Sequence, residues 1–381
     1  MAATDFTRLV LDARYVRVGA HDGISRYITG LSHGLAAIAD SRPDLEVRLM
    51  VSDPRQLDKL PQWPWFLGPD PVSVKEVVTG QVLNRQRPDV VFSPMQTMGA
   101  LRRRFGLILT LHDLIYYDHP TPPADLPAPV RAGWRLFHKS VLPQQLALNR
   151  ADAVATVSET SARLIRERRL TKRPVHVVPN AADAAEVLSI EMARQRFQER
   201  SQSAERNLLY MGSFMPYKDV ETLLRMAALL PDHTLHLASR ITPERRRQLS
   251  ALAPSARVIF HDGVDDPTYR RLLGEATALV HASRAEGYGL PLMEALSAGT
   301  PVVCSDTEIF REVAGDAARY VQVGDAPGFA AAVRELEDPN VSWGMIQRGL
   351  VVARRSSWEA SARELLAAVD AVRHHRLRAQ K

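Results

Sequence analysis

The stretch Arg284–Asp306 reads RAEGYGLPLMEALSAGTPVVCSD, and it is the most informative part of the chain. Glu286 and Glu294 stand eight residues apart around the glycine-rich turn Gly287–Gly289. Pro291 suits the first turn of a helix, where a missing N–H costs nothing, so we expect Glu294 about one turn inside a helix. The amides at such a helix start suit a phosphate or another anion. The pattern therefore predicts two carboxylates that face one ligand; a loop glutamate beside a solvated helix glutamate is the ordinary alternative.

Composition indicates a globular protein with more than one domain. The chain has 381 residues, and single hydrophobic cores stop growing near roughly 250–300 residues, so we expect two domains. Hydrophobic residues make up 45% and charged residues 24%, as is usual for globular proteins. The single cysteine, Cys304, excludes an internal disulfide, and the apolar run Pro301–Cys304 predicts that its thiol is buried.

The sequence carries no recognisable export or membrane-spanning signal. The N-terminus lacks a basic stretch followed by an apolar run of roughly 7–15 residues, so no signal peptide is expected. No window approaches the roughly 18 uninterrupted apolar residues of a membrane span. We therefore expect the protein in the cytoplasm.

Apolar runs of strand length alternate with helical periodicities along the chain. The first series of expected strands, read as covered on both faces, is Leu9–Leu11, Val47–Val51, Val90–Phe92, Leu107–Leu111, Val154–Val157 and Val175–Val178. The second series is Leu208–Met211, Leu235–Ala238, Val258–Phe260, Ala278–His281, Pro301–Cys304 and Tyr320–Val323. Strands that alternate with helices form parallel sheets with helices on both faces, so we predict an α/β fold.

Helical periodicity fills the intervals between these strands. Clear examples are Ser25–Ala39, Val220–Leu230 and Phe329–Leu336, and a long terminal helix is expected from Trp358 to about Arg376. The polar segment 183–206 is the expected boundary between the two halves.

Two loops that follow expected strands lead into expected helices. In the second half, Gly212 and Ser213 lead to Lys218 at the start of a helix, where charge and amides would hold a diphosphate. In the first half, Asp22 and Gly23 open a helix, with Ser25 a candidate cap. This is not the dinucleotide fingerprint, because a third glycine at the needed interval is missing.

Further polar residues end the next strands of the first half. His112 and Asp113 follow Leu107–Leu111, while Ser158 and Asn180 close the next two strands. In doubly wound sheets ligands collect beyond the carboxyl ends of the strands, so these positions predict a site. Ordinary turn chemistry explains Asn180 nearly as well.

These motifs resemble those of the retaining family-4 glycosyltransferases. The resemblance covers Glu286 to Val303, the Gly212–Lys218 loop, and the shorter motifs of the first half. It implies the GT-B fold: two Rossmann-like, doubly wound parallel-sheet domains facing a cleft, with a C-terminal helix crossing back to the first domain. The implied domains are an acceptor-binding domain at 1–185, a nucleotide-sugar-binding domain at 186–357, and the returning helix at 358–381.

The resemblance also implies a role for each matching residue. Glu286 would contact the transferred sugar, Glu294 would bind the ribose, Lys218 would bind the diphosphate, and His112 would contact the sugar hydroxyls or stabilise developing positive charge. The other implied donor-binding residues are Gly23, Gly212, Ser213, Gly287, Tyr288, Gly289 and Leu290. The implied acceptor or loop residues are Asp22, Arg26, Asp113, Ser158 and Asn180. Ser213 departs from the family, in which many members carry an arginine after the glycine.

The expected activity is transfer of a hexose, with retention, from a nucleoside diphosphate sugar to a glycan or glycolipid acceptor of the cell envelope. GDP-mannose is the leading donor, because the sequence is most similar to mannosyl- and rhamnosyltransferases. A UDP- or dTDP-sugar hexosyltransferase and a sugar-nucleotide epimerase of the same fold are the alternatives. The sequence contains no metal-binding motif, so we expect neither a metal nor another cofactor.

The net charge of +6 is unevenly placed. Residues 1–190 hold 24 Lys and Arg against 19 Asp and Glu, and residues 131–173 hold ten basic against three acidic side chains. Together with residues 102–104, these cations predict either a solvated helix face or a surface that docks on anionic lipid, at the inner face of the plasma membrane, or on an anionic acceptor. No nucleic-acid partner is expected, because neither stacking aromatics nor a recognised motif accompanies the charges.

Overall fold

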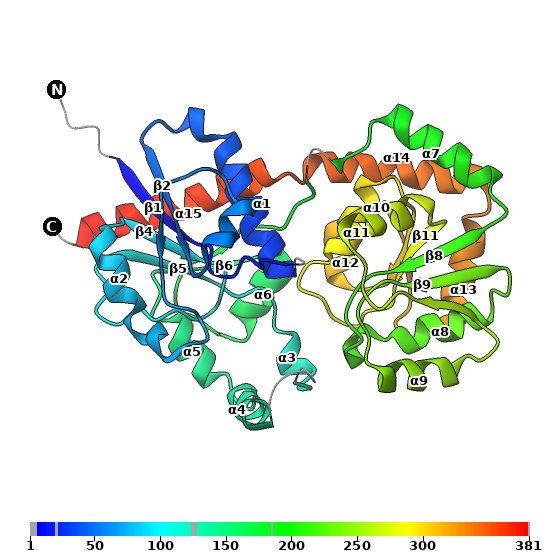
Figure 1. Ribbon diagram of the computed structural model, residues 1–381, viewed down its shortest axis with the longest axis horizontal. Helices are drawn as coiled ribbons and strands as arrows, with labels where there is room; N and C mark the ends of the chain where they lie inside the picture. Colours follow the sequence, from blue (N-terminus) through cyan, green and yellow to red (C-terminus); the bar gives the residue numbers. More distant parts are fainter. Residues whose placement is uncertain (1–5, 20–21, 123–127, 184–185, 380–381) are drawn as a thin grey trace. The chain divides into compact units, whose positions relative to one another are not determined.

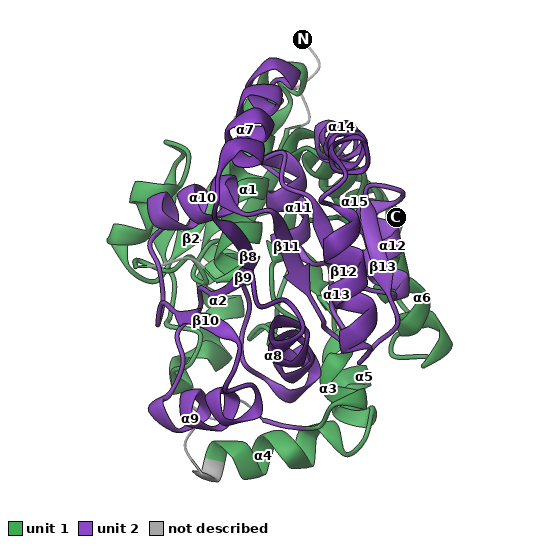
Figure 2. Ribbon diagram, turned by 90° about the vertical axis from the view of Figure 1, so that its right-hand side faces the viewer, with its two compact units in different colours: residues 1–120, 126–181, 357–381 green, residues 121–125, 182–356 purple. Residues whose placement is uncertain are grey.

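The computed structural model describes residues 6–19, 22–122, 128–183 and 186–379. The chain forms two compact units, shown in different colours in Figure 2. Unit 1 comprises Met1–Pro120, Leu126–Ala181 and Ser357–Lys381, and unit 2 comprises Thr121–Asp125 and Ala182–Ser356. Each unit has its own parallel sheet, so each is described separately.

Seven parallel strands form the sheet of unit 1, in the order β3-β2-β1-β4-β5-β6-β7. The strands are β1 (Thr7–Asp12), β2 (Leu45–Val51), β3 (Trp65–Leu67), β4 (Val90–Ser93), β5 (Gly106–Thr110), β6 (Ala153–Thr156) and β7 (Val175–Val177). β1 pairs with β2 on one side and with β4 on the other. The strand order therefore reverses between β1 and β4, as in a doubly wound sheet.

Helices surround the sheet of unit 1 (Figure 1). They are α1 (Gly23–Ala37), α2 (Thr79–Gln86), α3 (Ile115–Asp118), α4 (Ala128–His138), α5 (Leu142–Leu148), α6 (Glu159–Glu167) and α15 (Trp358–Ala379), with 3-10 turns η1 (Ala39–Ser41), η2 (Pro54–Lys59) and η3 (Val74–Val78). The terminal helix α15 packs on α1 and on β4, β5 and β7. A Cβ atom at Gly30 would lie 2.1 Å from the Trp358 ring, so α1 and α15 approach closely because α1 carries glycine there. The predicted return of the C-terminal helix to the first domain is confirmed.

Six parallel strands form the sheet of unit 2, in the order β10-β9-β8-β11-β12-β13. The strands are β8 (Arg206–Tyr210), β9 (His233–Leu237), β10 (Arg257–Phe260), β11 (Ala278–His281), β12 (Val302–Ser305) and β13 (Ala318–Val321). β8 pairs with β9 and with β11, so here the order reverses between β8 and β11. Both units thus have the doubly wound parallel sheet that the sequence predicts.

The helices of unit 2 cover both faces of its sheet (Figure 1). They are α7 (Ile190–Gln202), α8 (Val220–Ala228), α9 (Pro243–Leu252), α10 (Asp266–Glu275), α11 (Leu290–Ser297), α12 (Glu308–Ala314), α13 (Ala326–Glu335) and α14 (Pro339–Arg355), with the 3-10 turn η5 (Pro216–Lys218). α8 packs on α13 and α9, while α11 packs on α12 and α14. A core of buried side chains from α8, α13 and the strands between them, including Leu223 and Phe329, fixes the loops at the strand ends.

Each expected strand overlaps an observed one, but two predictions need correction. β3 was not predicted, because it has only three residues and none of them is buried. β7 and β10 were expected to be covered on both faces, yet no residue of either is fully buried. β3, β7 and β10 are all edge strands, and an edge strand has fewer neighbours to cover it.

Candidate active site

The first part of the site in unit 2 is the loop that follows β8. The amide of Gly212 donates to Ser239 Oγ at 3.0 Å, and the Tyr210 hydroxyl donates to the Ser213 carbonyl at 2.6 Å. A Cβ at position 212 would lie 2.8 Å from the Tyr210 hydroxyl, so the loop needs glycine here. These contacts hold the chain as it turns into η5, which ends at Lys218.

Lys218 and Glu286 form an ion pair across the point where the strand order reverses. Lys218 Nζ contacts Glu286 Oε1, and the same oxygen accepts a hydrogen bond from Ser283 Oγ at 3.0 Å. Both charged side chains are nearly buried, with 12% and 11% of their surface exposed. Burial opposes ionisation of the carboxyl, but Lys218 outweighs it, with help from His281, and holds the pKa of Glu286 below its usual range.

The glycine-rich turn leads from Glu286 into α11 as the sequence predicts. Gly289 has φ of 100° and stands before the first residue of α11, and Pro291 lies in the first turn. A Cβ at Gly289 would lie 2.9 Å from the Phe310 ring, so both conformation and space require glycine. Glu294 lies one turn inside α11 and accepts a hydrogen bond from the Tyr269 hydroxyl at 2.8 Å. The turn, the helix start and both carboxylates thus lie at the carboxyl end of the unit 2 sheet.

Three residues of this site were not predicted: Ser283 and Tyr269, which bond to the two carboxylates, and His281. His281, the last residue of β11, is fully buried, and its Nε2 lies 3.8 Å from Glu286 Oε1. Burial lowers the pKa of His281 to about 4, and Lys218 also disfavours its protonation. Nothing in the sequence marks His281 beyond its place five residues before Glu286, because the rings that pack on it, Tyr210 and Phe310, lie far from it along the chain.

In unit 1, the predicted loop after β1 is held by the start of α1. Asp22 caps α1 by accepting from the Ser25 amide at 2.8 Å, and it also accepts from Arg17 Nε at 2.8 Å. Ser25 was the expected cap, but its hydroxyl instead accepts from the Arg17 amide at 2.9 Å. Gly23 is the first residue of α1, and among the described residues no atom lies within 4 Å of a Cβ placed there.

His112 follows β5 and lies close to the other polar residues of unit 1. Its Nε2 is 2.8 Å from the Pro94 carbonyl, its ring packs edge-on against Tyr27, and its own carbonyl accepts from Ser161 Oγ at 3.1 Å. Burial lowers the pKa of His112, although the Pro94 carbonyl and Asp22 oppose the shift. A carbonyl can only accept, so Nε2 carries the proton and Nδ1 is left as an acceptor. His112 is therefore a neutral, oriented imidazole.

The remaining predicted residues of unit 1 follow β5, β6, β7 and the start of α1. Asp113 accepts from the Ile115 amide at 3.0 Å, and Ser158 caps α6 by accepting from the Ser161 amide at 3.0 Å. Asn180 is buried after β7, and its Oδ1 has no hydrogen-bond partner among the described residues. Arg26 lies in the first turn of α1. All of these positions lie at or beyond the carboxyl end of the unit 1 sheet.

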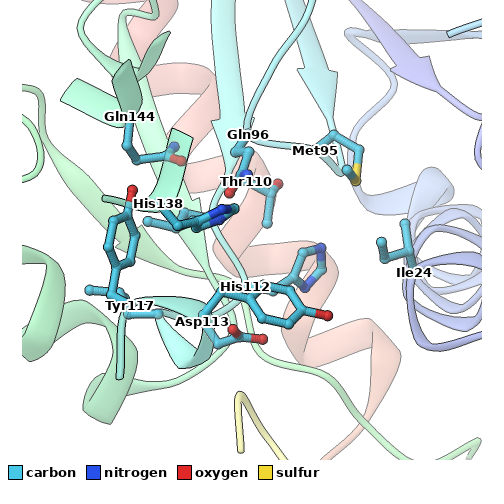
Figure 3. Close-up of a pocket in the computed structure, with 12 residues that line it drawn as sticks. Ile24, Met95, Gln96, Thr110, His112, Asp113, Tyr117, His138 and Gln144 are labelled. Atoms are coloured by element: carbon cyan, nitrogen blue, oxygen red, sulfur yellow. The ribbon is translucent and has the colours of Figure 1, made fainter. Parts of the chain in front are cut away.

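A cavity of about 160 Å³ opens beside His112 in unit 1. Figure 3 shows the side chains around it, which come from α1, the loop after β4, β5 and helices α3 to α5. Tyr117 and Gln144 line one end, and Tyr117 Oη and Gln144 Nε2 are buried without a partner within the part of the chain described. Mostly apolar walls with a few unsatisfied polar atoms are typical of a small-molecule site. Of the lining residues, only His112 and Asp113 were predicted from the sequence.

Among residues 6–19, 22–122, 128–183 and 186–379, no group of three or more His, Cys, Asp or Glu side chains is arranged to hold a metal ion. None of the helices in these ranges is both long enough and apolar enough to cross a membrane.

Family models match both halves of the chain. The model described as Glycosyltransferase Family 4 matches residues 21–186, and that described as Glycosyl transferases group 1 matches residues 191–367. These ranges contain the unit 1 residues around His112 and the unit 2 residues around Glu286, respectively.

Curated relatives match over shorter stretches. The chain is 35% identical to the O-antigen chain mannosyltransferase B of Escherichia coli over 162 residues, which are 40% of this chain and 42% of the relative. It is 33% identical to the phosphatidyl-myo-inositol mannosyltransferase of Mycolicibacterium smegmatis over 177 residues, or 44% and 45% of the two chains. The matched stretch thus spans less than half the length of each relative.

Solved structures match over nearly the whole chain. The sucrose-phosphate synthase of Thermosynechococcus elongatus has a TM-score of 0.74 at 20% identity, covering 98% of this chain and 100% of the other. The HepE protein of Anabaena, in complex with UDP and glucose, has a TM-score of 0.68 at 17% identity, covering 96% and 99%. Two doubly wound domains with a returning helix define the GT-B fold. The chain belongs to the family-4 glycosyltransferases, and its sequence is similar to those of mannosyltransferases.

Proposed function

We propose that the protein transfers a hexose, with retention of configuration, from a nucleoside diphosphate sugar to a glycan or glycolipid acceptor in the cytoplasm, without a metal. The observation that carries the proposal is the paired Lys218 and Glu286 beside the start of α11. A cation beside the start of a helix suits a diphosphate, and a buried carboxylate suits sugar hydroxyls. Electrostatic stabilisation of this kind is usually the largest single contribution to catalysis.

Within the donor site, Glu294 would bind the ribose, and Tyr269 would fix its orientation through their hydrogen bond. Gly212, Ser213 and the turn from Gly287 to Leu290 would lie against the phosphates and sugar. Because Glu294 is then committed to the nucleoside, the second carboxylate of a double displacement is missing. A same-face attack, in which a leaving phosphate oxygen takes the proton of the acceptor, fits these assignments better.

The acceptor would bind in unit 1, at the cavity beside His112. The neutral imidazole offers Nδ1 to a sugar hydroxyl, and Asp22, Gly23, Arg26, Asp113, Ser158 and Asn180 would shape the surrounding loops. The partnerless atoms Tyr117 Oη and Gln144 Nε2 offer a hydrogen-bond donor to a hydroxyl-rich ligand.

GDP-mannose is the leading donor, since the relatives include a GDP-mannose-dependent mannosyltransferase of Komagataeibacter xylinus, 28% identical over 199 residues. A thermal-shift panel of GDP, UDP, dTDP and ADP tests the nucleotide, and we expect the largest stabilisation with GDP. NMR of the product formed on envelope lipid extracts then gives the anomeric configuration. A clear preference for UDP would replace the donor, and an inverted product would overturn the retaining mechanism.

Part of the basic surface of unit 1 would contact anionic lipid. Several of its cations are already paired, since Arg103 binds Asp152 and Arg168 binds Asp118. Helix α4 instead combines the cation Arg135 with Leu136, whose surface is 70% exposed. Such a mixture favours the headgroup region of a membrane. Co-sedimentation with anionic vesicles should be reduced several-fold by Leu136→Glu, and binding that ignores lipid charge would contradict the idea.

A further inference from the structure

His281 is a buried titratable side chain beside the proposed donor site, and the proposed reaction gives it no role. His281 has no exposed surface, and no hydrogen bond of ordinary geometry reaches Nδ1 or Nε2 from the described residues. The backbone of Met211 raises the pKa of His281, but this effect is smaller than that of burial, which lowers it. A buried polar group without a partner is costly, so a native one calls for an explanation.

Packing fixes the direction of the His281 ring. Its centroid lies 5.4 Å from that of Tyr210 and 5.4 Å from that of Phe310, and the Phe310 ring meets it edge-on. Between these two rings, Nε2 lies 3.8 Å from Glu286 Oε1, just beyond hydrogen-bonding distance. A small movement of either side chain would therefore join them.

Glu286 has a reason to need such a partner. Its Oε1 is held by Lys218 and by Ser283 Oγ. In the proposed function, on which this inference rests, Lys218 binds the diphosphate of the donor. Glu286 would then lose its cation while its side chain remains only 11% exposed. A buried carboxylate that loses one partner requires another.

We propose that donor binding exchanges the partners of Glu286. Lys218 turns to the diphosphate, and the Nε2–H of His281 closes onto the carboxylate and holds it toward the sugar. His281 is thus a positioning residue for Glu286.

The charged surroundings of His281 favour the neutral ring that this exchange uses. Burial lowers the pKa of His281 to about 4, with Glu286 opposing and Lys218 adding to the shift. Tyr210 faces the ring from β8 and is in turn reached by Glu221 and Arg245, while Phe310 on α12 carries no charge. Near neutral pH the imidazole is therefore a hydrogen-bond donor rather than a cation.

Three variants test the exchange. His281→Phe keeps a packed ring without a donor, and His281→Gln restores a donor near the position of Nε2. The matched control is His233→Phe. His233 is also a buried histidine, but it is the first residue of β9, whereas His281 is the last residue of β11. We would measure kcat and donor KM from pH 5 to 9, together with the calorimetric affinity for GDP, or for UDP if UDP binds more tightly.

His281→Phe should lower kcat about 10- to 100-fold, as expected for a hydrogen bond to a charged group, and leave nucleotide affinity unchanged. The acid limb of the kcat profile should move to higher pH, because a carboxylate that loses a donor has a higher pKa. His281→Gln should recover most of both losses. Wild-type kcat in His281→Phe overturns the inference. The inference is also overturned if His281→Phe loses activity without a shift of the acid limb and His281→Gln does not restore the activity. A similar loss of activity in His233→Phe would overturn it as well.

A binding measurement separates this inference from the proposed function. In protein with 15N-labelled histidine, GDP should shift the Nε2 resonance of His281, which is identified by its absence from His281→Phe. If GDP binds and this resonance does not move, the exchange is wrong whatever the enzyme turns over. If no sugar nucleotide is turned over by the wild-type protein while the resonance moves, the proposed reaction fails and the partner exchange stands.

Discussion

The two units have the same kind of sheet but different chemistry at its carboxyl end. In unit 2, the site residues Lys218 and Glu286 form an ion pair. In unit 1, the central residue is His112, a neutral imidazole beside a mostly apolar cavity. The contrast indicates that a common backbone architecture can carry a charged pair in one unit and an apolar cavity in the other, because the loops at the strand ends carry the chemistry.

The largest expected effect is on the charged side of this comparison. Glu286→Gln removes the charge but keeps the size of the side chain, and we expect kcat to fall by about a thousandfold or more, in line with the loss of a preorganised electrostatic group. Nucleotide affinity should change little, because the proposed ribose and phosphate contacts, through Glu294 and Lys218, do not involve this carboxylate. Activity assays and calorimetry with the nucleotide check both parts. Near-normal turnover of Glu286→Gln would show that Glu286 does not have the proposed role in the reaction.

Lys218→Ala probes the other half of the ion pair. Binding of a nucleoside diphosphate should weaken about a hundredfold, while binding of the nucleoside alone should barely change, since only the diphosphate offers charge to the lysine. Calorimetry with the two ligands measures the difference. Equal losses for both would argue that Lys218 acts through the fold rather than through phosphate.

Glycines at the starts of α11 and α1 allow a matched comparison of the two units. Gly289→Ala forces a side chain into φ of 100° and against Phe310, so we expect a loss of roughly 1–2 kcal/mol in the free energy of unfolding. Gly23→Ala is the control, because no atom of the described residues lies within 4 Å of the added Cβ. Urea unfolding of both variants tests this. Equal destabilisation would mean that the turn around Gly289 is not held as described.

The smallest effect is expected in unit 1, at the mostly apolar cavity beside His112. Tyr117→Phe removes a buried hydroxyl that has no partner among the described residues, so thermal stability should be unchanged or slightly higher. If an acceptor hydroxyl satisfies this group, KM for the acceptor should rise several-fold while KM for the donor stays constant. Steady-state kinetics with each substrate varied in turn provides the test. An unchanged acceptor KM would place the acceptor elsewhere.

Much of the local geometry around Glu286 and Glu294 could be predicted because its signal is local. Gly289, Pro291 and Glu294 lie within one continuous stretch, and the requirements of a tight turn and a helix start are visible in consecutive residues. The corresponding helix start in unit 1 was predicted less well. Ser25 was the candidate cap of α1, but Asp22 caps it, because both residues carry a side-chain oxygen suited to capping and only the backbone geometry selects between them.

The cavity of unit 1 could not be predicted, for a different reason. Its walls combine β5 with α1, the loop after β4 and helices α3 to α5, and Tyr117 and Gln144 belong to short helices without a marked sequence motif. That Tyr117 Oη and Gln144 Nε2 lack hydrogen-bond partners among the described residues becomes apparent only when the surrounding side chains are known. Whether a buried polar atom has a hydrogen-bond partner depends on contacts between residues that are distant in the sequence, so only the tertiary structure shows it.

The sequence by itself determined the two doubly wound domains and the turn that presents Glu286 and Glu294. Periodicity and turn chemistry are properties of neighbouring residues, so they can be read along the chain. Only the tertiary structure decided that Lys218, 68 residues away, pairs with Glu286, and that His281 lies beneath them. The physical reason is the strand order: β11 returns to pair with β8, and the reversal brings the ends of these strands together.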